Sequence, residues 1–469
     1  MMSRPHTAQL GNSARGFTLI ELMVAIVLGL LLSFGIVQLF AATGKTNRVQ
    51  DAMGALQENG RYAIARLNAD IRMIGYEKLD SSGFVNSIPT AAANPSGVGT
   101  QTLAPTVYVD TLALPDMTGG LSAPAGWPAA TPWPMSLRYM IQGYECSDTS
   151  CSPAVPASLP AAGTSANQRV QSADVLTVRY INAAGWSATL GELAPVCAGN
   201  TLTSIAVTPA AAAPPVPASP AFNFVTGDLV LVTSGSSASI FRVNVAGNVL
   251  TPAAPLGGSV RCAGKTADSM LFNFSNDFVT ATYYLRLKTD PSDSTRLIPT
   301  LVRRQSTINT AALATNDQEI VQGIEQLDFL YTVERANGAT SMLTADDTQM
   351  AAQSTFANCP PAPYLYIKQF PPPAQPVEPQ CLWRAVKNVE VRLLANSVKN
   401  NYDLTPLDMA FRYDYAYDGT DNTQTPAAPS CTTGPTGNCK TATTTGGAPI
   451  GYMMRREFIS LASVRNYNP

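Results

Sequence analysis

The sequence predicts an α+β protein with a pilin-like plan, in which one long amino-terminal helix packs on a largely antiparallel β-sheet head. Residues 17–74 keep a helical pattern that is apolar all round at first and apolar on one side later. Beyond Leu79 the pattern changes to short apolar runs separated by Pro, Gly, Ala and Ser. One helix kept apart from an antiparallel sheet is the α+β arrangement.

The first half of the predicted helix has the length of a membrane span. From Leu22 to Ala42 there are 21 residues without a charge. As a helix this run is roughly 31 Å long, about one hydrocarbon thickness. We therefore expect residues 17–42 to cross a membrane.

The apolar run begins abruptly at the junction of Gly16 and Phe17. An ordinary secretory signal is cut after its apolar region, whereas a cut at this junction would leave the membrane segment on the mature chain. Glu21 lies within the apolar stretch, where an unpaired charge costs about 2.5–3.5 kcal/mol. An amine freed by cutting before Phe17 lies about one helical turn away and is the expected partner. Residues 1–16 are then a leader peptide.

The second half of the predicted helix is amphipathic. Its apolar residues recur at three- and four-residue steps, as expected of one buried face. They are Val49, Met53, Leu56, Ala63, Leu67, Ile71 and Ile74, with Gly60 in the remaining slot. Gly75 is a typical helix stop. We expect a helix over residues 17–75 and a β-rich head with loop insertions over residues 76–469.

Strand-like runs are spread over the head. They are Val175–Ile181, Asp228–Thr233, Ser239–Asn244, Tyr283–Leu287, Thr300–Arg303, Leu327–Val333, Ala385–Ala395 and Glu457–Arg465, and Gly323–Leu327 is expected to open with a short helical turn. Five stretches are expected to be loops or insertions. These are residues 81–135, 146–170, 207–221, 357–382 and 415–449.

Composition argues against an enzyme and against nucleic-acid binding. The chain has 469 residues, a formal charge of −2 and one histidine, His6, which lies in the predicted leader. Without that leader the charge is −4, because Arg4 and Arg15 are removed, and a negative balance gives no electrostatic case for nucleic acid. The lack of histidine in the mature chain excludes Ser-His-Asp and Cys-His catalysis and most zinc sites. We expect no catalytic residue, no metal ligand and no cofactor. A carboxylate-only hydrolase is the one enzyme class left open.

The eight cysteines form four pairs of neighbours in the sequence. The pairs are Cys146 with Cys151, Cys197 with Cys262, Cys359 with Cys381, and Cys431 with Cys439. Eight cysteines allow 105 connectivities, so this pairing rests on proximity alone. Disulfides fit an oxidising compartment.

Two arginine pairs and one aspartate-rich segment are interpreted as surface features. Arg303–Arg304 and Arg455–Arg456 are predicted to be surface charges at strand ends, with contact to an acidic partner as the alternative. Asp418–Asn422 lacks the spacing and the terminal glutamate of an EF-hand, so a solvated turn is the better interpretation than a calcium site.

The string from Arg15 to Glu21 resembles the processing site of type IV prepilins and type II secretion pseudopilins. The resemblance implies that a prepilin peptidase cuts after Gly16 and that Phe17 is then N-methylated. It also implies that Glu21 helps recruit the subunit into the growing fibre. Many major pilins have a proline within the membrane helix, and none lies between Phe17 and Ala42 here. This departure favours a minor pilin.

Segments along the whole chain are similar to the PilW family of minor type IV pilins. They are Leu56–Ala63, Asp70–Tyr76, Ser172–Tyr180, Gly227–Val232, Gly323–Tyr331 and Arg455–Phe458. The resemblance implies a role in pilus initiation and assembly, near the fibre tip. The implied partners are other minor and major pilins, the prepilin peptidase, the inner-membrane assembly platform and a tip adhesin.

The implied location is the inner membrane, crossed once with the amino terminus in the cytoplasm and the head in the periplasm, and later the pilus on the cell surface. Two alternatives stay open. One is a minor pseudopilin of type II secretion, which would affect enzyme secretion instead of twitching motility. The other is a tip adhesin that binds a surface through long loops.

Overall fold

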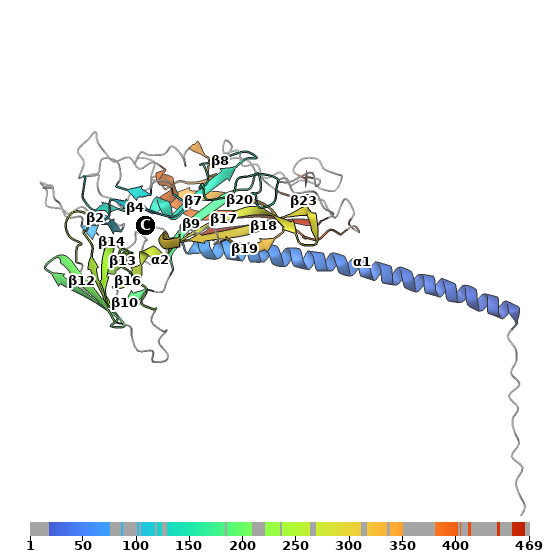
Figure 1. Cartoon of the computed structure of the whole chain (residues 1–469). Coiled ribbons are helices and arrows are strands. Elements are labelled where there is room, and N and C mark those ends of the chain that lie inside the picture. The colour runs from blue at the N-terminus through green and yellow to red at the C-terminus, as the bar shows by residue number, and fades with distance from the viewer. Residues whose placement is uncertain are drawn as a thin grey trace, which may run out of the picture.

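The fold was analysed in a computed structural model of the chain (Figure 1). The structure describes residues 18–75, 86–87, 101–102, 105–117, 120–123, 129–182, 185–208, 221–234, 237–262, 269–310, 317–334, 338–348, 350, 380–401, 404, 411–413, 439–440 and 453–464.

The longest element is helix α1 (Leu19–Arg72), which confirms the predicted amino-terminal helix. Thr18 caps its start, and Gly75 adopts φ 67° just after its end, a conformation that glycine reaches without strain. Figure 1 shows the first half of α1 projecting from the head and the second half lying along it. The buried residues of the helix all belong to this second half: Leu56, Gly60, Ala63, Leu67, Asp70 and Ile71.

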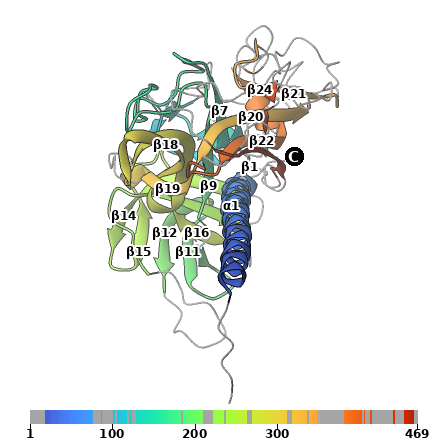
Figure 2. The same cartoon turned by 90° about the vertical axis from the view of Figure 1, so that its right-hand side faces the viewer.

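Two antiparallel sheets lie next to α1. The first has six strands in the order β19 (Asp317–Gln322), β18 (Asp293–Ser306), β17 (Phe278–Asp290), β9 (Val175–Ile181), β7 (Ile141–Cys146) and β8 (Cys151–Ser152). The second has four strands in the order β21 (Thr340–Leu343), β20 (Ile324–Glu334), β22 (Val386–Asn396) and β25 (Arg455–Ser463). Figure 2 looks along α1 and shows it between β19 on one side and β22 on the other.

A third sheet has nine strands and is mostly inserted between β9 and β17. Its main order is β10 (Trp186–Ser187), β16 (Met270–Asn273), β13 (Leu229–Ser234), β14 (Ser237–Ala246), β15 (Val249–Pro252), β12 (Thr201–Val207) and β11 (Leu193–Ala198). Two short strands, β3 (Thr106–Val107) and β6 (Trp133–Pro134), extend it beside β14, and the β3–β14 pair is parallel. Figure 1 shows this sheet beyond the carboxyl-terminal end of α1, far from the projecting half.

The remaining elements are short. Three two-stranded pairs are β1 (Asn86–Ser87) with β2 (Gln101–Thr102), β4 (Thr111–Leu112) with β5 (Leu121–Ser122), and β23 (Phe411–Arg412) with β24 (Cys439–Lys440). Helix α2 (Phe274–Asp277) joins β16 to β17, and the 3₁₀ turns are η1 (Leu137–Met140), η2 (Ile308–Thr310) and η4 (Cys381–Ala385).

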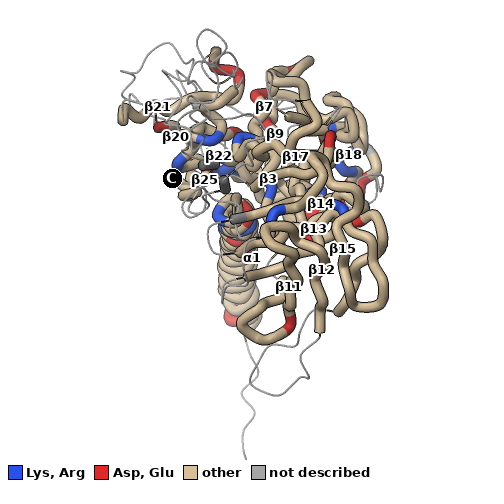
Figure 3. Tube along the Cα trace, turned by 90° about the vertical axis from the view of Figure 1, so that its left-hand side faces the viewer, with Lys and Arg blue, Asp and Glu red and all other residues tan. Residues whose placement is uncertain are grey.

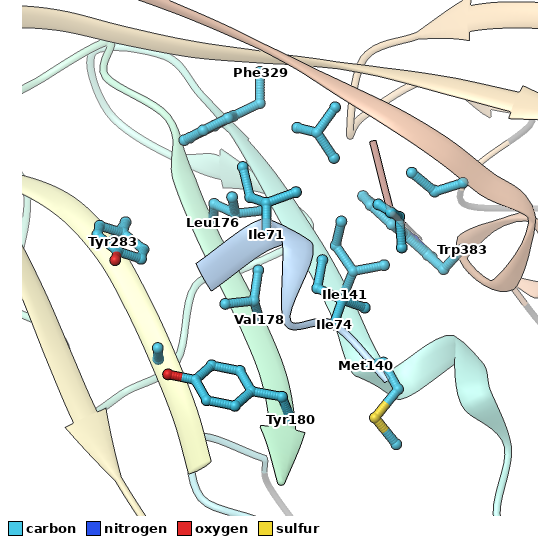
Figure 4. Close-up of a cluster of buried hydrophobic side chains, with 14 of the residues drawn as sticks. Ile71, Ile74, Met140, Ile141, Leu176, Val178, Tyr180, Tyr283, Phe329 and Trp383 are labelled. Atoms are coloured by element: carbon cyan, nitrogen blue, oxygen red, sulfur yellow. The ribbon is translucent and has the colours of Figure 1, made fainter. Parts of the chain in front are cut away.

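Two large hydrophobic cores lie in the described part of the head. The larger one joins α1 to the six- and four-stranded sheets, and Figure 4 shows Ile71 and Ile74 among Leu176, Phe329 and Trp383. The smaller core lies within the nine-stranded sheet and includes Trp186 and Phe241. One face of the nine-stranded sheet also packs into the larger core, through residues such as Leu229, Ile240 and Phe272. We call residues 186–273, which carry most of this sheet, the inserted part, and the part that packs on α1 the helix-bearing part.

The α+β class is confirmed, and most predicted runs coincide with strands. Val175–Ile181 is β9, and the two runs around Leu229 and Ile240 pair as β13 and β14. Residues 324–327 form the start of strand β20 instead of the predicted helical turn. Three of the stretches expected to be loops or insertions contain short strands: β1 to β6 lie within residues 81–135, β8 within 146–170, and β24 within 415–449. Gly323 precedes β20 with φ 82°.

Candidate functional site

The start of α1 holds the carboxylate singled out in the sequence. Glu21 lies in the first helical turn, and its Oε2 accepts hydrogen bonds from the Thr18 backbone N–H (3.0 Å) and hydroxyl (3.0 Å). The Glu21 N–H donates in return to the Thr18 hydroxyl (3.3 Å). This reciprocal arrangement is a capping box, and it turns the carboxylate back toward the amino terminus of the helix. Gly16 and Phe17 lie outside the described residues.

The projecting half of α1 has an apolar surface on every side. Its most apolar 18-residue window has a mean hydropathy of 2.6, and none of that window is buried within the chain. Leu19 is 76% exposed and Phe40 is 73% exposed. A surface of this kind is stable only when lipid or neighbouring helices cover it. The helix therefore anchors the protein in a membrane or in an assembly of such helices.

The second half of α1 lies very close to strand β25. A Cβ added to Gly60 would come within 2.3 Å of the Phe458 ring, so the helix backbone and this ring are in direct contact. Further along the helix, the Asn68 Nδ2 donates to the Ser460 hydroxyl (2.8 Å). These contacts fix the register of the helix on the four-stranded sheet.

A buried ion pair joins the carboxyl-terminal end of α1 to the six-stranded sheet. Arg303 Nε on β18 donates to Asp70 Oδ2 (2.6 Å), and both side chains are less than 5% exposed. Tyr283 on β17 also donates to Asp70 Oδ2 (2.9 Å), and Arg303 donates through Nη2 to the Tyr180 hydroxyl (2.9 Å). Since every partner is satisfied, the buried charges are compensated.

The electrostatics of this cluster keep both tyrosines neutral. Burial raises the pKa of Tyr180 and of Tyr283, and the charge of Asp70 raises both further. Burial opposes the charge of Arg303, but Asp70 and Tyr180 raise its pKa overall. Both hydroxyls therefore stay protonated at physiological pH and hold α1 through their hydrogen bonds with Asp70 and Arg303. We name Asp70, Arg303, Tyr180 and Tyr283 the helix-end cluster.

A second buried ion pair connects strands β20 and β25 of the four-stranded sheet. Arg455 Nε on β25 donates to Glu325 Oε2 on β20 (2.7 Å), and Asn396 Nδ2 on β22 donates to Glu325 Oε1 (2.7 Å). The expectation that Arg303, Arg304 and Arg455 are surface charges was therefore wrong, and only Arg456 is exposed. Their acidic partners lie within the chain: Asp70 for Arg303, Asp317 for Arg304, and Glu325 for Arg455.

A buried carboxylate joins the two sheets of the helix-bearing part. Asp174 Oδ1 accepts from the Cys146 N–H (2.9 Å), and Oδ2 accepts from the Phe329 N–H (3.2 Å). Burial raises the pKa of Asp174 well above its usual value, and Glu145 and Asp328 nearby raise it further. Its hydrogen bonds link β7 to β20, so its role is structural.

Two disulfides lie in described regions. Cys146 is bonded to Cys151 across the β7–β8 pair, and Cys197 is bonded to Cys262 within the inserted part. Cys381 is also disulfide-bonded. The expected pairs of Cys359 with Cys381 and of Cys431 with Cys439 each include a residue outside the described part of the chain.

Among the described residues, no group of three or more His, Cys, Asp or Glu side chains could hold a metal ion. The Asp418–Asn422 segment lies outside them. What the described residues do form is an exposed apolar anchor and a rigid connection between that anchor and the head.

Two family models match the chain. Residues 282–466 match Type IV Pilus-assembly protein W (PilW), and residues 11–37 match the prokaryotic N-terminal methylation motif. The resemblance predicted from the sequence is confirmed by these matches. No curated protein and no solved structure matches the chain.

The matched ranges coincide with functional parts of the fold. The methylation motif spans the Gly16–Phe17 junction, Glu21 and most of the apolar helix. The PilW match runs from β17 past β25, so it covers Arg303 and the sheet that carries α1, but it excludes strands β10 to β16. Together the matches support a type IV pilin-like protein that acts in pilus biogenesis, anchored by its amino-terminal helix.

Proposed function

We propose that this protein is a minor type IV pilin that takes part in initiating and assembling the pilus fibre, near its tip. The supporting observation is the fully exposed apolar half of α1, which begins with the Glu21 capping box and continues into a head-bound half. A helix of this kind inserts beside similar helices, and the head it carries is presented to neighbouring subunits.

The proposal includes a processing step at the amino terminus. A prepilin peptidase cuts between Gly16 and Phe17, and the new Phe17 amine is methylated. In the uncut chain the Glu21 carboxylate is held by Thr18 and already faces the amino terminus. Cutting places an amine within about one helical turn of this carboxylate, in the same subunit or in a neighbour. That pairing offsets the cost of a charge in lipid.

The proposed location follows from the helix and the leader. The chain crosses the inner membrane once, with its amino terminus in the cytoplasm and its head in the periplasm, and then enters the fibre on the cell surface. Its partners are other minor and major pilins, the peptidase, the assembly platform and a tip adhesin.

The test compares two carboxylates on the same helix. We expect Glu21→Ala to abolish piliation while the protein stays in the membrane fraction. Glu58→Ala is the control, because Glu58 is an exposed carboxylate on the head-bound half, and it should leave piliation intact. Normal piliation in the Glu21→Ala strain would refute the proposal. Mass spectrometry of the mature amino terminus should find methylated Phe17, and an intact Met1 would contradict the processing step.

A type II secretion pseudopilin would use the same helix, so a deletion strain separates the two fibres. Loss of twitching with normal enzyme secretion supports the pilus. Loss of secretion with normal twitching supports the pseudopilin.

A second candidate function, a tip adhesin, is favoured by the inserted part. It has its own core, it lies at the end of the head farthest from the anchor (Figure 1), and the PilW match excludes strands β10 to β16. Only six of residues 186–273 are charged, namely Glu192, Asp228, Arg242, Arg261, Lys265 and Asp268. Figure 3 shows few charges along β11, β12 and β15.

The adhesin function can be tested by removing this part. Ile181 and Phe278 are paired residues of β9 and β17, so a short turn can replace residues 182–277 and leave a hairpin. Fibres that form but no longer adhere would support the adhesin function. Loss of fibres would favour an assembly role for the inserted part.

A further inference from the structure

The disulfide between Cys146 and Cys151 closes the short hairpin of β7 and β8. The two cysteines lie directly opposite each other in the strand pair and are 5 positions apart in the sequence. Cys146 is only 2% exposed, whereas Cys151 is partly exposed and lies between the exposed residues Ser150 and Ser152. One cysteine of this disulfide can therefore be reached from outside the head, and the other is covered.

A buried arginine touches the covered sulfur. Arg169 Nη1 donates to Cys146 Sγ (3.3 Å), and Arg169 is 4% exposed. Its backbone is held in place, because its N–H donates to the Ala161 carbonyl oxygen (2.9 Å) and its carbonyl oxygen accepts from the Gly163 N–H (3.0 Å). A positive charge stabilises a thiolate, and a stabilised thiolate leaves a disulfide faster. Arg169 therefore makes Cys146 a good leaving group.

A carboxyl group also contacts Cys146. Asp174 Oδ1 accepts from the Cys146 N–H (2.9 Å), and a charged carboxylate at this place would oppose a thiolate. Burial raises the pKa of Asp174 well above its usual value, which favours the neutral acid. The positive charge of Arg169 is then not cancelled at the Cys146 sulfur.

The hairpin has hydrogen bonds that do not depend on the disulfide. The Ser147 N–H donates to the Ser150 carbonyl oxygen (2.8 Å), and the Ser150 N–H donates to the Ser147 hydroxyl (3.2 Å). The Ser172 N–H donates to the Ser147 carbonyl oxygen (3.3 Å). A disulfide that closes a short loop also stabilises a fold less than one that closes a long loop. The bond between Cys146 and Cys151 can therefore open while the hairpin stays folded.

We propose that Cys146 and Cys151 form a thiol–disulfide exchange site whose reductant is a protein dithiol in the compartment that holds the head. A thiolate of that dithiol attacks Cys151 Sγ and forms a mixed disulfide, while the bond to Cys146 breaks. Cys146 leaves as a thiolate beside Arg169 and then takes up a proton. This reaction does not require the chain to be a pilin, so the site goes beyond the proposed function.

The second thiol of the reductant completes the exchange. As a thiolate it attacks its own partner sulfur in the mixed disulfide, and Cys151 is released and takes up a proton. Two electrons and two protons have then passed to this chain, and the reductant has become a disulfide.

The disulfide between Cys197 and Cys262 is a control within the same chain. It joins residues 65 positions apart, so it closes a much longer loop. Cys197 is exposed and Cys262 is partly exposed. Accessibility alone therefore predicts that this disulfide is reduced before the bond between Cys146 and Cys151, whereas the exchange site predicts the opposite order.

The first experiment titrates the detergent-solubilised full chain with dithiothreitol. Free thiols are alkylated, and mass spectrometry measures the reduced fraction of each cysteine pair. We expect Cys146 and Cys151 to be half-reduced at a dithiothreitol concentration about tenfold lower than Cys197 and Cys262. Equal concentrations, or earlier reduction of Cys197 and Cys262, would overturn the proposal.

The second experiment changes the charge beside the sulfur. Arg169→Gln should raise the dithiothreitol concentration needed for Cys146 and Cys151 by about tenfold, and Arg169→Lys should keep it low because the charge is retained. An unchanged value for Cys197 and Cys262 shows that the variants are folded. If Arg169→Gln leaves the reduction of Cys146 and Cys151 unchanged in a folded chain, the assigned role of Arg169 is wrong.

The third experiment identifies the sulfur that is attacked. The probe is reduced thioredoxin whose second active-site cysteine is replaced by serine, so that the mixed disulfide cannot resolve. We expect the trapped thioredoxin on Cys151. A covalent link to Cys146, or to Cys197 in place of Cys151, would contradict the proposed order of steps.

Discussion

The helix-bearing part and the inserted part of the head are stabilised in different ways. The helix-bearing part relies on buried charges: Asp70 with Arg303, and Glu325 with Arg455. The inserted part contains few charges and combines an apolar core with the disulfide between Cys197 and Cys262. Buried ion pairs fix geometry more than they add stability, because they tolerate only one arrangement.

This difference agrees with the tasks proposed for the two parts. In the proposed function, the helix-bearing part holds the anchor at a fixed angle to the head. The inserted part has a core of its own, although it also contributes Leu229, Ile240 and Phe272 to the larger core. The PilW match begins at residue 282, after strands β10 to β16.

The largest expected effect comes from breaking the helix-end cluster. Asp70→Asn leaves Arg303 buried without a counter-charge and should destabilise the protein by about 3–5 kcal/mol. Denaturant unfolding of the detergent-solubilised full chain measures this. The control is Arg66→Gln, because Arg66 pairs with the same carboxylate at 3.4 Å but its side chain is 32% exposed, so the loss should stay below about 1 kcal/mol. Equal losses in the two variants would show that burial does not decide the effect.

The second largest expected effect is a loss of stability in the inserted part when its disulfide is removed. Replacing Cys197 and Cys262 by serine opens a link between residues 65 positions apart and should cost about 2–4 kcal/mol. Limited proteolysis should then cut within residues 186–273 while α1 and the four-stranded sheet stay protected. Simultaneous loss of protection in both parts would show that the two cores unfold together.

A pair of glycine substitutions tests the contact between α1 and β25. Gly60→Ala forces the Phe458 ring to move and should cost about 1–3 kcal/mol. Gly54→Ala meets no atom within 4 Å and should stabilise the helix by up to about 1 kcal/mol. Opposite signs in thermal unfolding support the close packing of the helix, and equal signs contradict it.

The smallest expected effect is a pH dependence of the unfolding free energy caused by Asp277, at the junction of the two parts. Asp277 ends helix α2 between β16 and β17, and burial raises its pKa to about 6 from 3.8. A raised carboxyl pKa means that the folded state binds the proton more tightly. The contribution of Asp277 to the free energy of unfolding is therefore fully present below pH 4 and is lost as the pH rises through 6. Because Asp277 is partly exposed, we expect a loss of about 1–2 kcal/mol.

Asp277→Asn should remove this part of the pH dependence. The measurement is the free energy of unfolding between pH 4 and pH 8 for both proteins. Parallel curves for the variant and the parent chain would show that Asp277 does not contribute.

Local patterns were enough to predict the anchor and many strands. The apolar run gave the projecting half of α1, and alternation gave β9 with its observed bounds, Val175–Ile181. The division of the strands into three sheets was not predicted. Strands β9 and β17 are paired although almost 100 residues separate them. No sequence pattern in either strand predicts that the other is its partner.

The residues of the candidate site show the same contrast between local and long-range signals. Glu21 stood out in the sequence, because a carboxylate in an apolar run is rare. The prediction that Arg303 and Arg455 are surface charges was wrong. An arginine on a strand can be buried when an acidic partner from a distant segment pairs with it, and the local sequence does not reveal that partner. The spacing of Asp70 from Arg303, over 230 positions, carries no local signal. Gly60 occupies an apolar slot of the helix, and that glycine is a sequence signal from which the close contact with Phe458 could have been predicted.

By itself the sequence determined the processing junction, the length and polarity of the helix, and the α+β class. These features depend on residues within a few turns or strand lengths of one another, so composition and periodicity encode them directly. Only the tertiary structure decided which charges are buried, which strands form the inserted part, and that Arg169 lies against the Cys146 sulfur. Such features arise from contacts between distant segments, and their energies depend on packing that no single segment contains.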